Sequence, residues 1–291
     1  MSPFLIAVTF DVDMAGGAWG EAADECGYFF RAVLPEAQRA GVEAGTIFVR
    51  IDDEMMHVYG RADYLLSKYE IEFRQLRESG WEIGWHPHPY TRVQGVAQQN
   101  TNEAEIVAEL FRHGPQARAA GMTSVRMGWG YATPAIMNSL EQLGFLVDSS
   151  AIPRPRYAWE TSIKDWAGTP RHAYYPSVLD CRVPGTPRRN ILELPVSVLP
   201  VCAPYDTQTV LRHVNPAYRQ AIFETALTAA TFETMITVTH PHELLPADQA
   251  DELLSRDPAV LRRNLQFLAD HFSSMHDVQW RTISNLAAGC G

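Results

Sequence analysis

Short, continuously apolar runs alternate along the chain with longer amphipathic stretches. The first run, 4–13, is typical of a strand buried on both faces of a parallel sheet. The first amphipathic stretch, 24–40, repeats apolar residues at helical spacing and stops at Gly41. The same criteria predict further strands at 45–50, 81–85, 124–126, 144–148, 190–197, 234–239 and 278–280, and helices at 61–79, 101–120, 134–143, 216–230 and 258–272. This alternation predicts a parallel sheet with right-handed crossovers, either a barrel or a doubly wound sheet.

One stretch breaks the alternation. Residues 153–187 are rich in proline and aromatic residues and show little periodicity. Because disordered segments are poor in aromatics, we expect an ordered, irregular insertion that passes over the mouth of the site. We therefore expect residues 1–291 to form a single catalytic domain that carries this insertion.

Composition narrows the class of protein. The net charge of −10 argues against nucleic acid as a partner. No apolar run reaches the roughly 18–20 residues of a transmembrane helix, and residues 1–10 lack a basic region and a cleavage site, so we expect a cytoplasmic protein. No Gly-rich phosphate loop follows the first strand. Cys26, Cys181, Cys202 and Cys290 show no Cys-x-x-Cys spacing, which is typical of reduced thiols.

Chemically active side chains stand where the predicted strands end. They are Asp11, Asp13, His86, His88, Arg126, His240 and His242. The carboxyl ends of parallel strands share one edge, where sites are built. Two histidines one residue apart beside a carboxylate suit zinc and its neighbours, with an open position for water. A second carboxylate could take a proton from that water, a histidine could protonate a leaving amine, and an arginine could keep the base ionised. A metal hydrolase is the leading interpretation.

The order of these motifs resembles a known family. Thr-Phe-Asp-Val-Asp, Glu-Ile-Gly-x-His, an arginine before Gly-Trp-Gly, Leu-Glu-Leu-Pro-Val and Thr-His-Pro-His-Glu follow one another over about 4–245. This order resembles the polysaccharide deacetylase family (NodB homology, carbohydrate esterase family four). The resemblance implies a distorted or incomplete (β/α) barrel. It also implies a metal-dependent hydrolase that removes an N-acyl group, acetyl or formyl, from a sugar of a cell-surface polysaccharide or its precursor.

The resemblance also implies roles for particular residues. Asp11 matches the catalytic base, Arg126 the arginine that positions it, and His240 the general acid. The expected ligands of a divalent metal, zinc in the first place, are Asp13, His86 and His88. The residues expected to contact the substrate are Trp129, Trp85, Leu194, His242 and Tyr90.

Three positions depart from the family pattern. Val12 separates two aspartates that are usually adjacent. The second metal histidine usually stands four residues after the first, where this chain has Tyr90, so we assign that ligand to His88. Gly128 stands where the arginine motif normally carries a proline.

Two other functions remain as alternatives. One is a metal-independent, allantoinase-like amidohydrolase of the same superfamily, which would apply if His88 did not reach the metal position. The other is a carbohydrate-binding relative without catalysis, which the presence of Asp11, Arg126 and His240 together disfavours. We expect a nucleotide- or lipid-linked sugar as substrate rather than finished polymer. The sequence does not predict the oligomeric state.

Overall fold

Eight parallel strands form the frame of the molecule. The computed structural model describes residues 3–13, 24–94, 96–159, 162–246 and 251–289. The strands of the main sheet are β1 (Pro3–Val12), β2 (Thr46–Val49), β3 (Glu82–Trp85), β6 (Ser124–Val125), β7 (Val147–Asp148), β10 (Leu192–Glu193), β13 (Thr234–Thr239) and β14 (Asp277–Trp280). Their order across the sheet is β10-β7-β6-β3-β2-β1-β13, and β14 also pairs with β1.

Strand β1 is an interior strand of this sheet, with neighbours on both edges, and its side chains are apolar on both faces. From Ile6 to Val12 every residue is buried. Phe10 pairs with Ile47 of β2 on one side and with Thr239 of β13 on the other. The prediction of a strand buried on both faces is confirmed.

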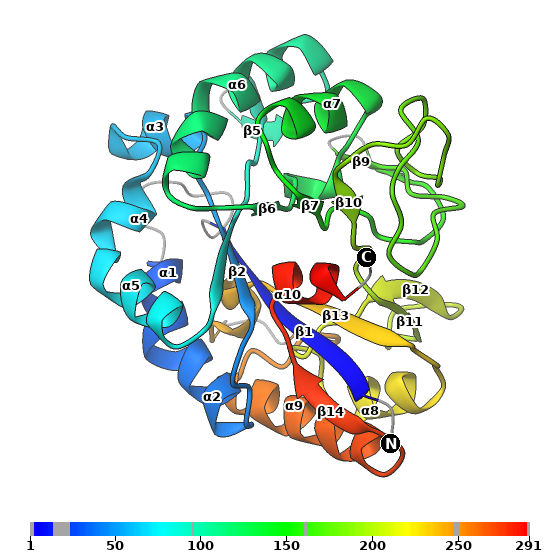
Figure 1. Ribbon diagram of the computed structural model, residues 1–291. Coiled ribbons are helices and arrows are strands. Elements are labelled where there is room, and N and C mark those ends of the chain that lie inside the picture. The colour runs from blue at the N-terminus through cyan, green and yellow to red at the C-terminus, as the bar shows by residue number, and fades with distance from the viewer. Residues whose placement is uncertain (1–2, 14–23, 95, 160–161, 247–250, 290–291) are drawn as a thin grey trace.

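Helices surround the curled sheet (Figure 1). They are α1 (Glu25–Tyr28), α2 (Leu34–Arg39), α3 (Asp53–Tyr59), α4 (Tyr64–Lys68), α5 (Glu70–Glu78), α6 (Glu103–Ala119), α7 (Pro134–Gln142), α8 (Gln220–Thr228), α9 (Pro258–Ser273) and α10 (Ile283–Ala288). A π-helical turn, Phe29–Val33, joins α1 to α2. Helix α6 begins as predicted, since the Asn102 side chain accepts hydrogen bonds from the backbone N–H groups of Ala104 and Glu105. The predicted helix at 61–79 is interrupted at Tyr69.

The barrel is incomplete between β10 and β13, which do not pair with each other. Isolated backbone hydrogen bonds bridge this gap, from Ser197 N to Ile236 O at 3.0 Å and from Val238 N to Val214 O at 2.9 Å. The sheet is therefore an incomplete (β/α) barrel and not a doubly wound sheet, and the predicted fold class is confirmed.

Three short antiparallel pairs were not predicted. They are β4 (Tyr90–Val93) with β5 (Val96–Gln99), β8 (Tyr157–Trp159) with β9 (Ser162–Lys164), and β11 (Val198–Val201) with β12 (Val210–His213). Each strand has only three or four residues, too few for alternation to stand out in the sequence. Helix α10 was missed for the same reason.

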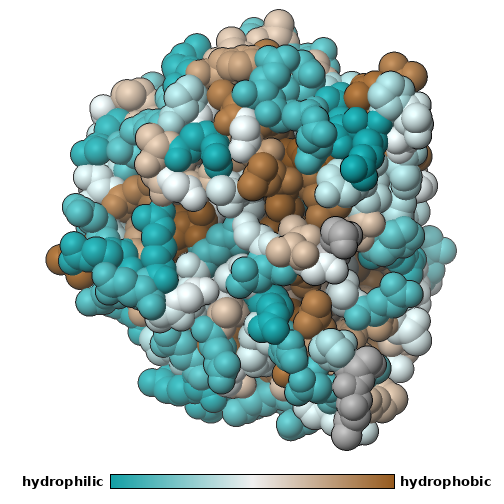
Figure 2. All heavy atoms as spheres, in the orientation of Figure 1, coloured by the Kyte–Doolittle hydropathy of each residue, from teal (hydrophilic) through white to brown (hydrophobic). Residues whose placement is uncertain are grey.

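The amino ends of the strands are covered by α10, which lies in front of the sheet in Figure 1. The Ile283 N–H donates to the Thr46 hydroxyl at 2.9 Å, and the Ser284 hydroxyl donates to Glu82 at 2.6 Å. On this face hydrophilic side chains cover most of the surface, and smaller apolar areas lie between them (Figure 2).

Two further sequence expectations concern thiols and membranes. Cys26 and Cys181 are buried free thiols, Cys202 is an exposed one, and Cys290 lies outside the described residues. Among the helices of the described chain, none combines the length and the apolar character that a membrane crossing requires.

Candidate active site

The carboxyl ends of β1, β3, β6 and β13 converge on a pocket of about 720 Å³. All seven strand-end residues selected from the sequence line it: Asp11, Asp13, His86, His88, Arg126, His240 and His242. Side chains two residues apart on a strand point to the same side, so Asp11 and Asp13 both face the pocket while Val12 is buried in the core. The predicted gathering of these residues is confirmed in the geometry.

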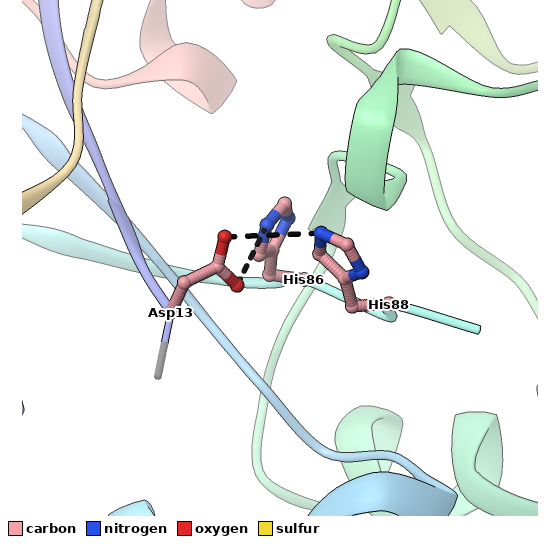
Figure 3. Close-up of side chains that lie close together, drawn as sticks. All are labelled: Asp13, His86 and His88. Carbon is pink, nitrogen blue, oxygen red and sulfur yellow. Dashed lines mark ion pairs between the residues drawn. The ribbon is translucent and has the colours of Figure 1, made fainter. Parts of the chain in front are cut away.

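Asp13, His86 and His88 form a compact group on one side of the pocket floor (Figure 3). His86 Nε2 lies 3.4 Å from Asp13 Oδ1, and His88 Nε2 lies 3.8 Å from Asp13 Oδ2. One ligand atom from each residue lies within 4.8 Å of the others. Asp13 Oδ1 and His86 Nε2 are buried, and within the described chain neither has a hydrogen-bond partner. Buried polar atoms without partners are costly, so this group fits a divalent cation with nitrogen and oxygen ligands.

The two rings differ in their charge state, and one of them is in the form that binds metals. His86 Nδ1 lies 2.6 Å from the carbonyl oxygen of Arg126, which orients the ring and directs Nε2 toward Asp13. Burial alone would lower the pKa of His86, yet that pKa is raised because Asp13 and Asp11 face the ring. Burial lowers the pKa of His88 well below its usual range, so its ring is neutral, the form that binds metals. Burial would raise the pKa of Asp13, but His88 and His86 hold it well below its usual value.

Aromatic rings and a glycine fix the position of His88. Its ring stacks on Tyr90 at a centroid distance of 4.6 Å and meets Trp129 edge-on at 4.0 Å. Trp129 itself has a φ of +56°, a strained conformation that holds its ring against His88. A Cβ added to Gly128 would lie 2.4 Å from the His88 ring. Gly128 therefore makes room for a histidine two residues after His86.

Gly128→Ala tests this packing. The added methyl group is expected to displace the His88 ring and to weaken divalent-metal binding about 10–100-fold, the usual effect of disturbing the support of a metal ligand. Zinc affinity by competition with a chromophoric chelator measures the effect. The matched control is Gly289→Ala, where the nearest atom to an added Cβ lies at an ordinary 3.5 Å. Equal zinc affinity of Gly128→Ala and wild type would contradict the role given to Gly128.

Asp11 and Arg126 form a buried ion pair in the same pocket as Asp13, His86 and His88. Arg126 Nη1 donates to Asp11 Oδ1 at 2.7 Å, and both side chains are buried. The guanidinium also donates to Thr9 Oγ1 at 2.6 Å, to the Ser149 carbonyl at 2.8 Å and to the Ser149 hydroxyl at 2.9 Å. These bonds fix Arg126, and Arg126 in turn holds the Asp11 carboxylate in place.

His240 stands on the opposite wall with a carboxylate behind it. Its Nε2 lies 3.9 Å from Asp11 Oδ2 and 3.8 Å from Asp13 Oδ2, while its Nδ1 lies 3.5 Å from Glu243 Oε1. Burial alone would lower the pKa of His240, but Glu243 and the two aspartates raise it to about 10. Burial would raise the pKa of Glu243, but His240 lowers it to about 2. His240 is thus a cation at neutral pH.

The sequence interpretation gave Glu243 no role, although it ends the Thr-His-Pro-His-Glu motif. Its Oε2 accepts hydrogen bonds from the His240 backbone N–H and from the Asn215 side chain, each at 2.8 Å. The sequence did contain a signal for this contact. Glu243 stands three residues after His240, the spacing at which a glutamate in the first turn of a helix accepts a hydrogen bond from the backbone N–H of the residue before the helix.

The residues expected to bind substrate lie in different places. Trp129 and His242 line the pocket, and His242 Nδ1 lies 3.2 Å from Glu25. Trp85 is fully buried, stacks on Phe145 and donates to a backbone carbonyl, so the structure places it in the core behind β3. Leu194 is also a core residue, and Val196 lines the pocket instead. Tyr90 supports His88 from beside the pocket.

Comparison with known proteins supports the fold assignment. No protein-family model matches the sequence, and no curated protein is significantly similar to it. Among solved structures, a proposed polysaccharide deacetylase from Mycobacterium smegmatis matches with a TM-score of 0.54 and 18% identity over 98% of this chain and 89% of its own. A family 4 carbohydrate esterase from Streptomyces lividans matches with a TM-score of 0.45 and 9% identity, over 97% of this chain and 94% of its own. A 4-alpha-glucanotransferase from Thermococcus litoralis matches with a TM-score of 0.48 and 12% identity. This match covers 98% of this chain and 38% of the glucanotransferase chain.

These similarities concern the fold. The chain has the architecture of the Mycobacterium smegmatis protein, as the resemblance of its motifs predicted. The other two similarities have TM-scores below 0.5 and add nothing to the assignment. Because one fold hosts many activities, the activity is argued from the site.

Proposed function

We propose that this protein is a metal-dependent hydrolase that removes an N-acyl group from a sugar. The observation that carries the proposal is the arrangement of the pocket floor. Asp13, His86 and His88 converge on one side, and the Asp11–Arg126 ion pair and the His240 cation face them. This arrangement supplies a cation site, a base and an acid within one pocket.

The residues divide the chemistry of amide hydrolysis between them. When bound, a divalent cation supplies polarisation of the acyl carbonyl and acidification of water. Asp11, held in place by Arg126, accepts a proton from the attacking water as the new C–O bond forms. The His240 cation donates its proton to the sugar nitrogen as the C–N bond breaks. The products are a carboxylate and the free amine of the sugar.

Other residues position the participants. Glu243 holds the His240 ring from behind, and Trp129 offers an aromatic face in the pocket on which a sugar ring can stack. A backbone N–H near Trp129 is the expected donor to the developing oxyanion. The acyl group is acetyl or formyl.

The test is release of acetate or formate, with the matching free amine, from N-acylated sugars incubated with zinc-supplemented protein. UDP-linked N-acetyl and N-formyl sugars are compared with chitin oligomers. We expect turnover that disappears with chelator and returns with added zinc. Turnover that survives complete metal removal would instead establish a metal-independent amidohydrolase, and sugar binding without any turnover would establish a carbohydrate-binding protein.

A further inference from the structure

Two carboxyl groups lie side by side in the main sheet, outside the pocket. Asp148 is the last residue of β7 and Glu193 the last residue of β10, and the two are partners in the parallel pairing of these neighbouring strands (Figure 1). Both residues are fully buried, and neither lines the pocket. The proposed mechanism uses neither of them. Because a buried charge is costly and a like charge beside it adds to the cost, this pair needs a physical account.

The hydrogen bonds of the pair are only half complete. Asp148 Oδ1 accepts the Ser150 hydroxyl at 2.5 Å, and Glu193 Oε1 accepts the Ala151 N–H at 3.0 Å. The second oxygens, Asp148 Oδ2 and Glu193 Oε2, are buried, and within the part of the chain that the structure describes no group donates to either. One proton between these two oxygens would satisfy both, since a protonated carboxyl group donates and a carboxylate accepts.

The surroundings favour that single proton. Burial raises the pKa of Asp148, and burial together with the charge and the hydrogen bond of Asp148 raises the pKa of Glu193 well above its usual range. Two further titratable groups face the pair, the Tyr174 phenol and the Cys181 thiol. Burial raises the pKa of both, that of Cys181 to about 12. Both are therefore neutral at physiological pH and bring no charge to the pair.

Hydrogen bonds connect Asp148 to the support of the metal site. The Ser150 hydroxyl, which donates to Asp148, accepts the Met127 backbone N–H at 2.8 Å. Met127 precedes Gly128, whose missing side chain makes room for the His88 ring. The Asp148 carboxyl group therefore fixes the start of the turn against which the His88 ring packs.

A second path connects Glu193 to the expected base. Ala151, whose N–H donates to Glu193, lies two residues after Ser149. Ser149 accepts two hydrogen bonds from the Arg126 guanidinium, at 2.8 Å and 2.9 Å. The same guanidinium donates to Asp11 at 2.7 Å, and its charge also faces the carboxyl pair. One negative charge on the pair leaves Arg126 bound to Asp11, whereas a second negative charge would compete with Asp11 for that cation.

We propose that Asp148 and Glu193 share one proton. In this form the pair positions the His88 ring and the Arg126 guanidinium, and it loses that role as pH rises. This inference rests on the proposed function and adds a pH dependence to its site. A proton that the folded protein holds more tightly than the unfolded chain stabilises the fold at low pH, and this stability is lost as pH rises through the raised pKa of the pair. Above that pKa the two carboxylates repel each other.

Amide variants test the shared proton. In Glu193→Gln or Asp148→Asn a permanent N–H donor replaces the proton, and the remaining oxygen keeps the hydrogen bond to Ala151 or to Ser150. Urea unfolding from about pH 5 to about pH 9 compares each variant with wild type, all supplemented with zinc. Where the pair titrates, we expect wild type to lose stability relative to each variant. The expected loss is up to about 10-fold in the unfolding equilibrium constant per pH unit, which is the effect of one proton.

Zinc affinity tests the positioning role. Asp148→Ala removes the acceptor of the Ser150 hydroxyl and is expected to weaken zinc binding about 10–100-fold, whereas Asp148→Asn keeps that acceptor and should bind zinc as tightly as wild type at neutral pH. In turnover assays Glu193→Gln should keep its kcat to a higher pH than wild type does. The matched control is Glu70→Gln, which removes an exposed carboxylate from the first turn of α5 and should follow wild type in every measurement.

Three outcomes decide the inference. Stability curves of wild type and both amide variants that run parallel over the whole pH range would overturn the shared proton. Zinc affinity equal to that of wild type in folded Asp148→Ala would overturn the positioning role, and Ser150→Ala, which cuts the same link to Met127, provides that measurement if Asp148→Ala does not fold. Stability and zinc binding need no turnover. The expected results in a protein that hydrolyses none of the tested sugars would therefore support the pair and overturn only the proposed hydrolase.

Discussion

Replacing Asp11 with asparagine is expected to lower kcat for sugar deacylation about 10²–10⁴-fold, the usual contribution of a general base. The amide group has nearly the shape of the carboxylate and still accepts the Arg126 hydrogen bond, but it does not take a proton from water. The stability cost should stay below the roughly 3–5 kcal/mol that follows complete loss of a buried ionic partner. Steady-state kinetics at saturating substrate measure the effect, and thermal unfolding confirms that the variant is folded.

The matched control is Asp63→Asn, since Asp63 pairs with Arg61 on the surface and lies outside the pocket. This variant should keep wild-type kcat. Zinc content should be unchanged in Asp11→Asn, because Asp11 is outside the proposed ligand group. If Asp11→Asn hydrolyses the substrate at the wild-type rate, another residue is the base.

His88→Ala is expected to abolish near-stoichiometric zinc binding, whereas Tyr90→Phe should retain it. His88 Nε2 faces Asp13, while the Tyr90 ring stacks on the His88 ring, a contact that phenylalanine preserves. Loss of one of three protein ligands should weaken zinc binding by more than the 10–100-fold typical of a supporting residue. Metal analysis of freshly purified proteins, before and after incubation with zinc, provides the measurement.

The pair of variants separates two possible ligand sets. Zinc retained in His88→Ala and lost in Tyr90→Phe would mean that the phenol, at the family's usual histidine position, completes the site. Wild-type protein that binds no zinc even after incubation would contradict the metal site altogether and favour the metal-independent alternative.

Most of the site was predictable because strand ends are visible in a sequence. Apolar runs such as 4–13 mark buried strands, and a charged or imidazole residue at the end of such a run marks the edge where parallel strands open. Strand order was not needed, since every carboxyl end of a parallel barrel faces the same side. This explains how Asp11 and His240, more than 220 residues apart, were assigned to one pocket.

The errors arose where side-chain direction decides the outcome. Trp85 ends a strand beside His86, but alternation turns its ring away from the pocket into the core. The reason why glycine stands at position 128, where the family has proline, was not evident from the sequence. The structure gives it, because any side chain at this position would collide with the His88 ring. Of the irregular 153–187 insertion, Arg154, Pro155 and Arg156 line the pocket.

The pairing of β1 with β13 and β14 has a consequence for how the chain folds during synthesis. Strand β1, which precedes the other strands of this sheet in the sequence, finds two of its three partners only after residues 234–239 and 277–280 have been made. Until then one edge of β1 is unpaired, and pairing of such distant segments is slow. Asp11 consequently reaches the neighbourhood of His240 only after the segment that carries β13 has emerged. A nascent chain that stops before β13 therefore has neither the complete sheet nor a complete pocket.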